Sequence, residues 1–175
     1  MLEIQQFNLG TGSPHLILDR DSTLTVDMGY TFQIHNFSFV EGAIDALSIA
    51  KELDMTVSIA TNQSGVGRGL FTTEQLFDFN QHLRNQIYGQ TGLEISWILS
   101  CTHIEADVCS CRKPNPGMLL ELIKLSSIPR EKSAFFGNSE SDQLAGQNAG
   151  MYSRIAFGAN LSEAIMNWSH SLDIN

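Results

Sequence analysis

Apolar positions along the chain follow two alternating spacings. Short apolar runs, typical of buried strands, occur at 15–18, 55–60, 95–99, 134–136 and 152–157. Between them lie segments in which apolar residues recur every three or four positions, as on one face of a helix. These helical segments are 42–53, a segment that follows a capping box formed by Thr72 and Gln75, 116–126, 141–149 with Gly150 as its C-cap, and 161–168. The alternation predicts an α/β fold with a doubly wound, mostly parallel sheet.

The same pattern continues evenly over the whole chain of 175 residues, without repeats or linker-like tracts. Hydrophobic residues make up 42% of the chain and charged residues 17%, as in ordinary globular proteins. We therefore expect residues 1–175 to form a single domain, with a core large enough to be stable without disulfides.

The net charge of the chain indicates which classes of molecule it is unsuited to bind. The chain has 10 Lys and Arg against 19 Asp and Glu, a formal net charge of −9. An acidic chain is a poor partner for nucleic acid or for an anionic membrane, so we expect neither. No apolar run approaches the roughly 20 residues that span a bilayer, and the N-terminus does not resemble a secretory signal. We expect a monomer in the cytoplasm.

Polar residues stand directly after the predicted strands. In doubly wound sheets, ligands bind outside the carboxyl ends of the strands, so these residues are the first candidates for chemistry. Across the strand ends they are Asp19, Asp21, Thr61, Asn62, Cys101, His103, Arg112, Lys113, Asn138 and Asp142.

Asp19 and Asp21 follow the first predicted strand. Side chains two apart in extended chain point to the same side, so both carboxylates can face one site. Such a pair can bind Mg²⁺, or one carboxylate can attack phosphorus while the other handles protons. A solvated turn with the sequence Asp-Arg-Asp-Ser is the alternative.

The segment 61–69 follows the second predicted strand and reads Thr-Asn-Gln-Ser-Gly-Val-Gly-Arg-Gly. Thr61 and Asn62 offer polar groups, the glycines allow backbone amides to approach an anion, and Arg68 adds a positive charge. The segment fits a phosphate-holding loop. It also fits an ordinary polar loop, since Gly, Ser and Asn are common in loops.

All three cysteines lie within eleven residues and share their segment with a histidine. Cys101, His103, Cys109 and Cys111 have the spacing C-x-H-x5-C-x-C, which suits a tetrahedral Zn²⁺ site. Four protein ligands would fill the coordination sphere, so this zinc site is expected to be structural. Free buried cysteines beside an unrelated histidine are the alternative.

Arg112 and Lys113 come at the end of that cysteine-rich loop, and Asn138 and Asp142 follow the fourth predicted strand. Lys and Arg there can neutralise and grip a phosphoryl group; otherwise they are two solvated cations. Asp142 can hold a metal, orient Lys113, or simply occupy the first turn of a helix.

Taken together, these segments resemble the haloacid-dehalogenase superfamily of phosphatases. Within it the chain is most similar to the D-glycero-D-manno-heptose 1,7-bisphosphate phosphatases. The resemblance runs from about residue 16 to 152. It rests on Leu-Asp-Arg-Asp-Ser-Thr, Val-Asp-Met-Gly-Tyr, Asn-Phe-x-Phe-Val-Glu-Gly, Thr-Asn-Gln-Ser-Gly-Val-Gly-Arg-Gly, the Cys/His cluster, Arg-Lys-Pro-Asn-Pro-Gly-Met and Gly-Asn-x-x-x-Asp.

The resemblance implies a Mg²⁺-dependent phosphatase of carbohydrate metabolism without a cap domain. Asp19 would be the nucleophile that forms an aspartyl-phosphate, and Asp21 would be the acid and base. Asp19, the Asp21 carbonyl and position 138 would hold Mg²⁺, while Asp142 is a further candidate. Thr61 and Lys113 would hold the phosphoryl group. The remaining implied contacts to a small phosphorylated sugar come from Asn62, Arg68 and Arg112.

Two residues depart from the family pattern. Ser22 stands where the heptose-type enzymes usually have glycine, and Asn138 stands where they usually have a metal-binding aspartate. Because of Asn138, a pseudophosphatase that binds its ligand without turnover is one alternative function. Histidinol-phosphate phosphatases, which share the cysteine spacing, are the other close alternative. An interaction module built on zinc is a third, but the basic surface that would favour it is absent from the composition.

Overall fold

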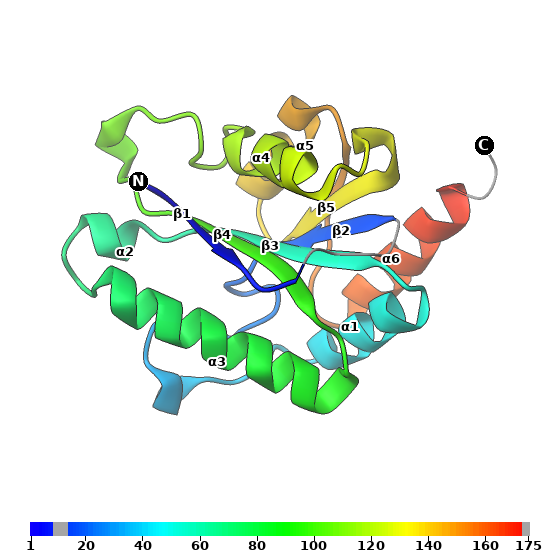
Figure 1. The fold of residues 1–175 in the computed structure, drawn as a ribbon, viewed down its shortest axis with the longest axis horizontal. Coiled ribbons are helices and arrows are strands. Elements are labelled where there is room, and N and C mark those ends of the chain that lie inside the picture. The colour runs from blue at the N-terminus through cyan, green and yellow to red at the C-terminus, as the bar shows by residue number, and fades with distance from the viewer. Residues whose placement is uncertain (9–13, 173–175) are drawn as a thin grey trace.

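A central sheet organises the molecule. The computed structural model describes residues 1–8 and 14–172. Within them, the sheet has the order β1-β4-β3-β2-β5-β6 (Figure 1). Its strands are β1 (Leu2–Gln6), β2 (His15–Leu18), β3 (Thr56–Asn62), β4 (Ile95–Cys101), β5 (Ser133–Gly137) and β6 (Tyr152–Ile155). All neighbouring strands pair in parallel except β1, which runs antiparallel to β4 along the edge of the sheet.

Helices cover both faces of this sheet. The α-helices are α1 (Ala43–Glu52), α2 (Ser64–Gly67), α3 (Thr73–Thr91), α4 (Gly117–Ser126), α5 (Glu140–Ala149) and α6 (Ala159–Leu172). Helices α4 and α5 lie on one face, and α1, α3 and α6 lie on the other (Figure 1). The predicted doubly wound, mostly parallel α/β fold is therefore confirmed. No cap domain is evident in the part of the chain that the structure describes.

Local sequence signals fix several element ends. At the start of α3, the Thr72 hydroxyl accepts from the Gln75 N–H and the Gln75 side chain accepts from the Thr72 N–H, so the predicted capping box is confirmed. Gly150 ends α5 in the left-handed conformation, with φ of 72°. Strand β3 runs two residues beyond its predicted end, because Thr61 and Asn62 still pair with the last residues of β4.

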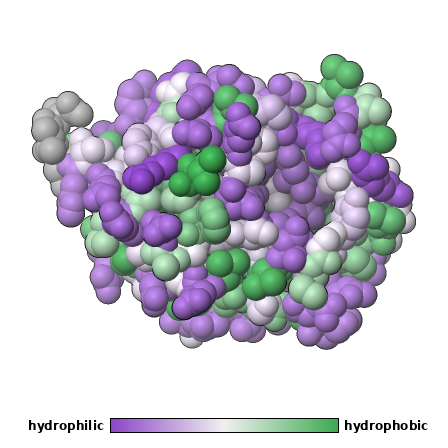
Figure 2. All heavy atoms as spheres, turned by 180° about the vertical axis from the view of Figure 1, so that it is seen from behind, coloured by the Kyte–Doolittle hydropathy of each residue, from purple (hydrophilic) through white to green (hydrophobic). Residues whose placement is uncertain are grey.

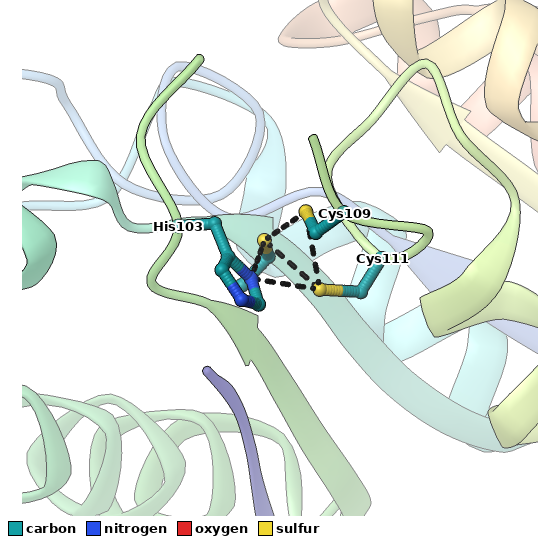
Figure 3. Close-up of side chains that lie close together, drawn as sticks. His103, Cys109 and Cys111 are labelled. Carbon is teal, nitrogen blue, oxygen red and sulfur yellow. Dashed lines mark hydrogen bonds between the residues drawn. The ribbon is translucent and has the colours of Figure 1, made fainter. Parts of the chain in front are cut away.

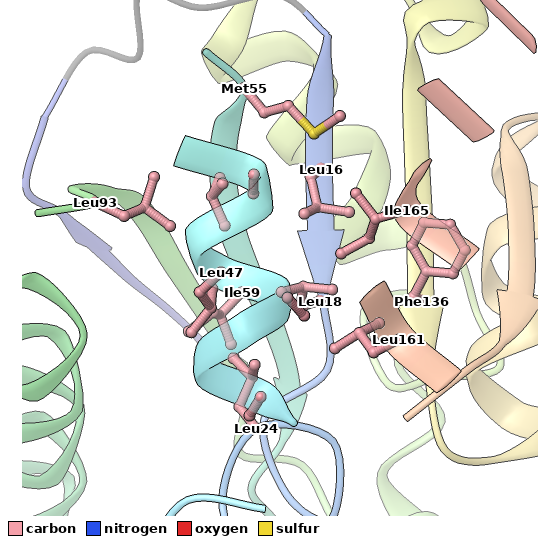
Figure 4. Close-up of a cluster of buried hydrophobic side chains, with 14 of the residues drawn as sticks. Leu16, Leu18, Leu24, Leu47, Met55, Ile59, Leu93, Phe136, Leu161 and Ile165 are labelled. Atoms are coloured by element: carbon pink, nitrogen blue, oxygen red, sulfur yellow. The ribbon is translucent and has the colours of Figure 1, made fainter. Parts of the chain in front are cut away.

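Apolar side chains of the strands fill a core on each face of the sheet. Leu16 and Leu18 of β2 are fully buried against Leu47 of α1 and Ile165 of α6 (Figure 4). Ile17, between them, points to the opposite face and packs under α4 and α5. Each such side chain contributes about 1.5–3 kcal/mol through burial, so the central strands are held rigidly from both sides. That rigidity fixes the residues that follow β2.

The face of the molecule opposite to the view of Figure 1 is mostly polar. Seen from behind, hydrophobic side chains are scattered among hydrophilic ones (Figure 2). Within residues 1–8 and 14–172, no helix combines the length and apolar character needed to cross a membrane.

The connections of the sheet create a switch point beside β2. From β2 the chain proceeds to β3 and β4 on one side, then crosses over to β5 and β6 on the other. Loops therefore leave the carboxyl ends of β2 and β5 in opposite directions, which opens a crevice between them. The polar residues after β2, β3 and β5 meet at this end of the sheet.

Candidate active site and metal centre

A polar cavity of about 200 Å³ lies at the carboxyl ends of β2, β3 and β5. It brings together residues from four separate segments of the chain, as the sequence analysis expected. The lining residues are Asp19, Asp21, Ser22, Asp27, Thr61, Asn62, Lys113, Asn138, Ser139, Ser141 and Asp142. We call this cavity the catalytic pocket.

A buried lysine between two carboxylates forms the floor of the catalytic pocket. Lys113 Nζ lies 2.6 Å from Asp19 Oδ1 and 2.6 Å from Asp142 Oδ1, and it donates a 3.0 Å hydrogen bond to the Ala60 carbonyl. Burial by itself lowers the pKa of a lysine, but the two carboxylates outweigh it and raise the pKa of Lys113 above its usual value. Lys113 is therefore a fixed positive charge at this site.

For the buried Asp19, the effect of burial on the pKa is larger than the effect of the opposite charge. Loss of hydration raises the pKa of its carboxyl to about 6, although the ammonium of Lys113 lowers it. The nearby carboxylates Asp142 and Asp21 raise it further. A carboxylate in these surroundings gains from any additional cation placed beside it.

Asp142 is held by its own helix. Its Oδ2 accepts from the Ser139 N–H at 3.0 Å and from the Ser139 hydroxyl at 2.6 Å, which completes a capping box at the start of α5. Gly137 lets the carboxyl approach, because a Cβ there would lie 2.5 Å from Asp142 Cγ. With Oδ1 paired to Lys113, both oxygens are engaged, and the geometry favours Asp142 as the partner that orients Lys113.

Asp21 is held by four side chains, one of which is Thr25, whose hydroxyl lies 3.4 Å from Asp21 Oδ1. The Arg20 guanidinium donates 3.0 Å hydrogen bonds to both of its oxygens, and Gln63 Nε2 donates to Oδ2 at 2.6 Å. Gln63 also donates to the Thr61 hydroxyl at 2.8 Å, and that hydroxyl lies 3.4 Å from Asp21 Oδ2. The residue after Asp21, Ser22, has φ of 57°, a left-handed conformation that favours glycine. This explains why a glycine suits that position.

Asn62 faces the backbone of Lys113. Its Nδ2 donates to the Lys113 carbonyl at 3.2 Å, and its Oδ1 accepts from the Lys113 N–H at 3.1 Å. The two bonds occupy both ends of the amide. Asn62 therefore positions Lys113; because it also lines both cavities, its predicted contact with substrate stays a prediction.

The pocket residues also fit a divalent cation. Asp19, Asp21 and Asn138 border the same cavity and offer carboxylate, carbonyl and amide oxygens, the ligands that Mg²⁺ prefers. The excess of negative charge around Asp19 favours a cation as well. Asn138 supplies an uncharged oxygen where an aspartate would add a negative charge.

A second cavity of about 420 Å³ adjoins the catalytic pocket and shares Asn62, Lys113 and Ser141 with it. Arg112 and Glu105 line this outer pocket. Glu105 bridges two arginines: its carboxylate lies 2.6 Å from Arg112 Nη2 and 2.8 Å from Arg68 Nη2. Arg68 does not line the outer pocket itself, but Glu105 joins it to Arg112 at the pocket's edge.

The predicted Cys/His ligands converge where β4 ends at Cys101 and its loop to α4 begins (Figure 3). The sulfur–sulfur distances are 3.1 Å for Cys101–Cys111, 3.6 Å for Cys109–Cys111 and 3.8 Å for Cys101–Cys109. His103 Nδ1 lies 3.3 Å from Cys111 Sγ and 3.5 Å from Cys101 Sγ. A tetrahedron with Zn–S bonds near 2.3 Å has edges of about 3.8 Å. The cluster could therefore hold a tetrahedral metal ion.

The thiol chemistry of the cluster agrees with this geometry. No disulfide joins the three cysteines. Burial raises the pKa of Cys101 and of Cys111. Burial also opposes ionisation of Cys109, but the Arg112 N–H, 3.3 Å from its sulfur, and the neighbouring Cys111 lower its pKa. A bound cation removes the cost of ionising the two buried thiols.

Sequence reasoning missed three residues that shape the site. Arg20 and Gln63 hold Asp21, and Glu105 holds Arg68 and Arg112. A signal existed only for Arg20, which stands between two aspartates and would be a costly burial without them. The contacts of Gln63 with Asp21 and of Glu105 with Arg68 span 42 and 37 residues, which no local pattern reveals.

The chain matches a known protein family over most of its length. A family model described as polynucleotide kinase 3 phosphatase matches residues 16–165. The D-glycero-beta-D-manno-heptose-1,7-bisphosphate 7-phosphatase of Helicobacter pylori strain 26695 is 34% identical over 158 residues, 90% of this chain and 91% of the relative. The enzyme of the same name from Pasteurella multocida is 36% identical over 140 residues, 77% of this chain and 76% of the relative.

A solved structure is similar as well. The D,D-heptose 1,7-bisphosphate phosphatase from B. bronchiseptica, crystallised with magnesium and phosphate, superposes with a TM-score of 0.76 at 28% sequence identity. The match covers 88% of this chain and 86% of that one.

Proposed function

Since the chain belongs to the haloacid-dehalogenase superfamily of phosphatases, we propose that it hydrolyses D-glycero-D-manno-heptose 1,7-bisphosphate through an aspartyl-phosphate on Asp19. The observation that carries the proposal is the pairing of Asp19 with Lys113 beside Asp21 at the switch point of the sheet. A nucleophilic carboxylate, a fixed cation and a second carboxylate are the groups that a phosphate ester needs for two-step hydrolysis.

The first step uses Asp19 as the nucleophile and Asp21 as the acid. With Oδ1 held by Lys113, Oδ2 of Asp19 forms a bond to phosphorus while the bond from phosphorus to the sugar oxygen breaks. Asp21 gives its proton to the leaving oxygen. Lys113 and the Thr61 hydroxyl line the pocket where negative charge spreads over the phosphoryl oxygens, and they stabilise that charge.

The second step reverses the role of Asp21. Asp21 takes a proton from water, the water oxygen bonds to phosphorus, and the bond from phosphorus to Asp19 breaks to release inorganic phosphate. When Mg²⁺ is bound by Asp19, the Asp21 carbonyl and Asn138, it supplies charge that neutralises the phosphoryl group. Asn62 keeps the Lys113 backbone in place throughout.

The two adjoining cavities support a bisphosphate substrate. The catalytic pocket has room for a phosphoryl group, and the outer pocket, about twice as large, has room for a sugar. Arg112 and Arg68 provide positive charge at the far side, where a second phosphate would lie. The names of the relatives agree with this substrate class.

The Cys/His cluster supports a structural Zn²⁺ site. We propose that zinc orders the loop from β4 to α4, which carries Arg112 and Lys113 to the two pockets. Free thiols suit a reducing compartment, which agrees with a cytoplasmic enzyme. We further propose that residues 1–175 act as a single domain and as a monomer.

A phosphate-release screen tests the proposed function. The substrates are the heptose 1,7-bisphosphate, other sugar bisphosphates, sugar monophosphates and histidinol phosphate, each assayed with added Mg²⁺. We expect the highest kcat/KM for the heptose bisphosphate. Preference for histidinol phosphate would overturn the proposed substrate, and no release from any ester would overturn the proposed activity.

A pseudophosphatase is the second candidate, and Asn138 is the observation that favours it. Asn138 borders the catalytic pocket, where it contributes an oxygen without a charge. If Mg²⁺ binds too weakly for turnover, the chain binds a phosphorylated ligand only. Binding of the heptose bisphosphate without phosphate release, together with release by Asn138→Asp, would select this alternative.

A further inference from the structure

The Arg20 side chain is fully buried, although it lies in the loop between two pocket aspartates. A buried guanidinium is costly unless its donors are paired, so the groups around it are held in defined positions. Its Nε and Nη2 atoms donate one hydrogen bond each to the two oxygens of Asp21, both at 3.0 Å. This fork fixes the plane of the carboxyl group as well as its position.

The other side of Arg20 is anchored to the body of the protein. Nη1 donates to Asn80 Oδ1 of α3 at 3.0 Å, and the guanidinium carbon lies 4.8 Å from the centre of the Phe79 ring. Asn80 in turn donates to Gln5 Oε1 of β1 at 2.8 Å. The fork that holds Asp21 is therefore braced by two secondary-structure elements outside the catalytic pocket.

Arg20 also reaches the loop that closes one side of the pocket. Its Nη2 donates to the Thr31 carbonyl at 2.9 Å. The Thr31 hydroxyl donates to Asp27 Oδ1 at 3.0 Å, and Asp27 lines the catalytic pocket. Arg20 thus makes hydrogen bonds to both Asp21 and the loop 27–31, and it holds them in fixed positions relative to each other.

We propose that Arg20 is a positioning residue that aligns Asp21 as the proton donor to the leaving sugar oxygen. The inference rests on the proposed function, because it takes Asp21 as the general acid. As Asp21 gives up its proton, negative charge develops on two oxygens that the guanidinium already faces, and Arg20 stabilises that charge. Alignment without movement removes the cost of reorganising the acid during the reaction.

The dependence of the rate on the leaving group separates this role from general damage. An aliphatic leaving oxygen needs a proton as the P–O bond breaks, whereas p-nitrophenolate leaves without one. We compare kcat/KM, which reports the step that expels the leaving group. The substrates are p-nitrophenyl phosphate and the aliphatic ester of the screen above that the wild-type protein cleaves fastest.

Arg20→Lys is the main variant, because it keeps the charge and the stem but loses the fork. We expect the ratio of kcat/KM for the aliphatic ester to that for p-nitrophenyl phosphate to fall at least about tenfold, since general acid catalysis is worth about 10²–10⁴. Arg84→Lys is the matched control. Arg84 lies 5.0 Å over the Phe7 ring and pairs with Glu94, away from the pocket, so its ratio should not change.

Asn80→Ala is the second variant, which loosens Arg20 without touching Asp21. It should lower the same ratio less strongly, and it decides the question if circular dichroism shows that Arg20→Lys does not fold. If kcat/KM falls equally for both esters, the ratio is unchanged. That result would overturn the proposed role of Arg20 and leave the proposed function of the protein standing. A wild-type chain that releases phosphate from no aliphatic ester would overturn the proposed function and this role with it.

Discussion

The ammonium nitrogen of Lys113 lies 2.6 Å from Asp19 Oδ1, and both side chains are almost completely buried. Asp142 adds a second carboxylate at the same distance from the same nitrogen. Asp19 and Asp142 carry two negative charges and Lys113 carries one positive charge, so the three side chains together have a net negative charge. A phosphoryl group that enters beside them brings further negative charge, so the site favours a divalent cation as well as a substrate.

Replacing the proposed nucleophile should abolish turnover and preserve the fold. In Asp19→Asn the amide is a far weaker nucleophile than a carboxylate, so we expect phosphate release to fall below detection. The far-ultraviolet circular dichroism should stay unchanged. Asp45→Asn on α1, outside the pocket, is the matched control and should keep full activity. Full activity in Asp19→Asn would place the chemistry elsewhere.

Asn138→Asp should strengthen Mg²⁺ binding. The substitution adds one negative charge beside the proposed metal position, and the larger desolvation of a carboxylate offsets part of that gain. The net change should be about 1–3 kcal/mol, or roughly ten- to a hundredfold in the Mg²⁺ midpoint of phosphate release. Asn167→Asp on α6 adds the same charge far from the pocket and serves as the control. An unchanged midpoint and maximal rate would mean that Asn138 does not contact the metal.

Gently purified protein should contain about one equivalent of zinc per chain, measured by elemental analysis. Cys109→Ala should lose the zinc and lower the free energy of unfolding by several kcal/mol, because binding of the metal is coupled to folding of the loop. Ser110→Ala, one residue along the same loop, should change neither quantity. Less than about a tenth of an equivalent in the unmodified protein would rule out a tight zinc site.

Glu105→Gln should lower KM for the bisphosphate. The Glu105 carboxylate pairs with Arg112, which lines the outer pocket, and with Arg68 beside it, so a second phosphate has to compete with Glu105. Since Glu105 is 69% exposed, the pair is weak, and we expect only about a two- to fivefold fall at low salt. The KM for a sugar monophosphate should not change. A higher KM for the bisphosphate would show that Glu105 orients the arginines instead of competing with substrate.

Stability should fall in mild acid because of His15. This side chain is fully buried, its Nε2 lies 2.8 Å from the Ser58 hydroxyl, and burial lowers its pKa from 6.5 to about 3. Between these values the unfolded chain binds a proton that the folded chain does not. Unfolding therefore becomes easier as the pH decreases through this window, by up to about 1.4 kcal/mol per pH unit.

A double variant, His15→Phe with Ser58→Ala, isolates this contribution. Urea unfolding between pH 6 and pH 4 should show a shallower decline of stability in the double variant than in the unmodified protein. Ser58→Ala alone keeps the imidazole and should retain the steep decline. Parallel pH profiles for all three proteins would exclude His15 as the source.

The segments that form the catalytic pocket and the Cys/His cluster could be predicted, because each one follows a strand. The carboxyl ends of parallel strands meet at one edge of the sheet. The convergence of Cys101 with His103 followed from spacing within a single loop. The solvated-turn alternative for residues 19–22 is wrong for Arg20, which is fully buried. The neighbouring Asp21 was a local sign of a partner for Arg20, but Asn80 lies 60 residues away, so no local pattern predicted that contact.

Strand β1 escaped prediction for a physical reason. Its sequence, Leu-Glu-Ile-Gln-Gln, has only two apolar residues, and most of its side chains are partly or fully exposed. Such an edge strand is held by backbone hydrogen bonds to β4 more than by its own burial. The register, in which Leu2 faces Cys101 and Gln6 faces Trp97, follows from pairing that no periodicity reports.

Strand β1 also protects the molecule against aggregation with other copies of the chain. Every residue of β4 is buried, and without β1 the strand would offer open N–H and C=O groups beside a strongly apolar sequence. Such an edge recruits strands from other chains and starts aggregation. Strand β1 pairs with those groups, and three of its five residues are Glu or Gln. Solubility at this edge therefore depends on a short polar strand that contributes no residue to the catalytic pocket.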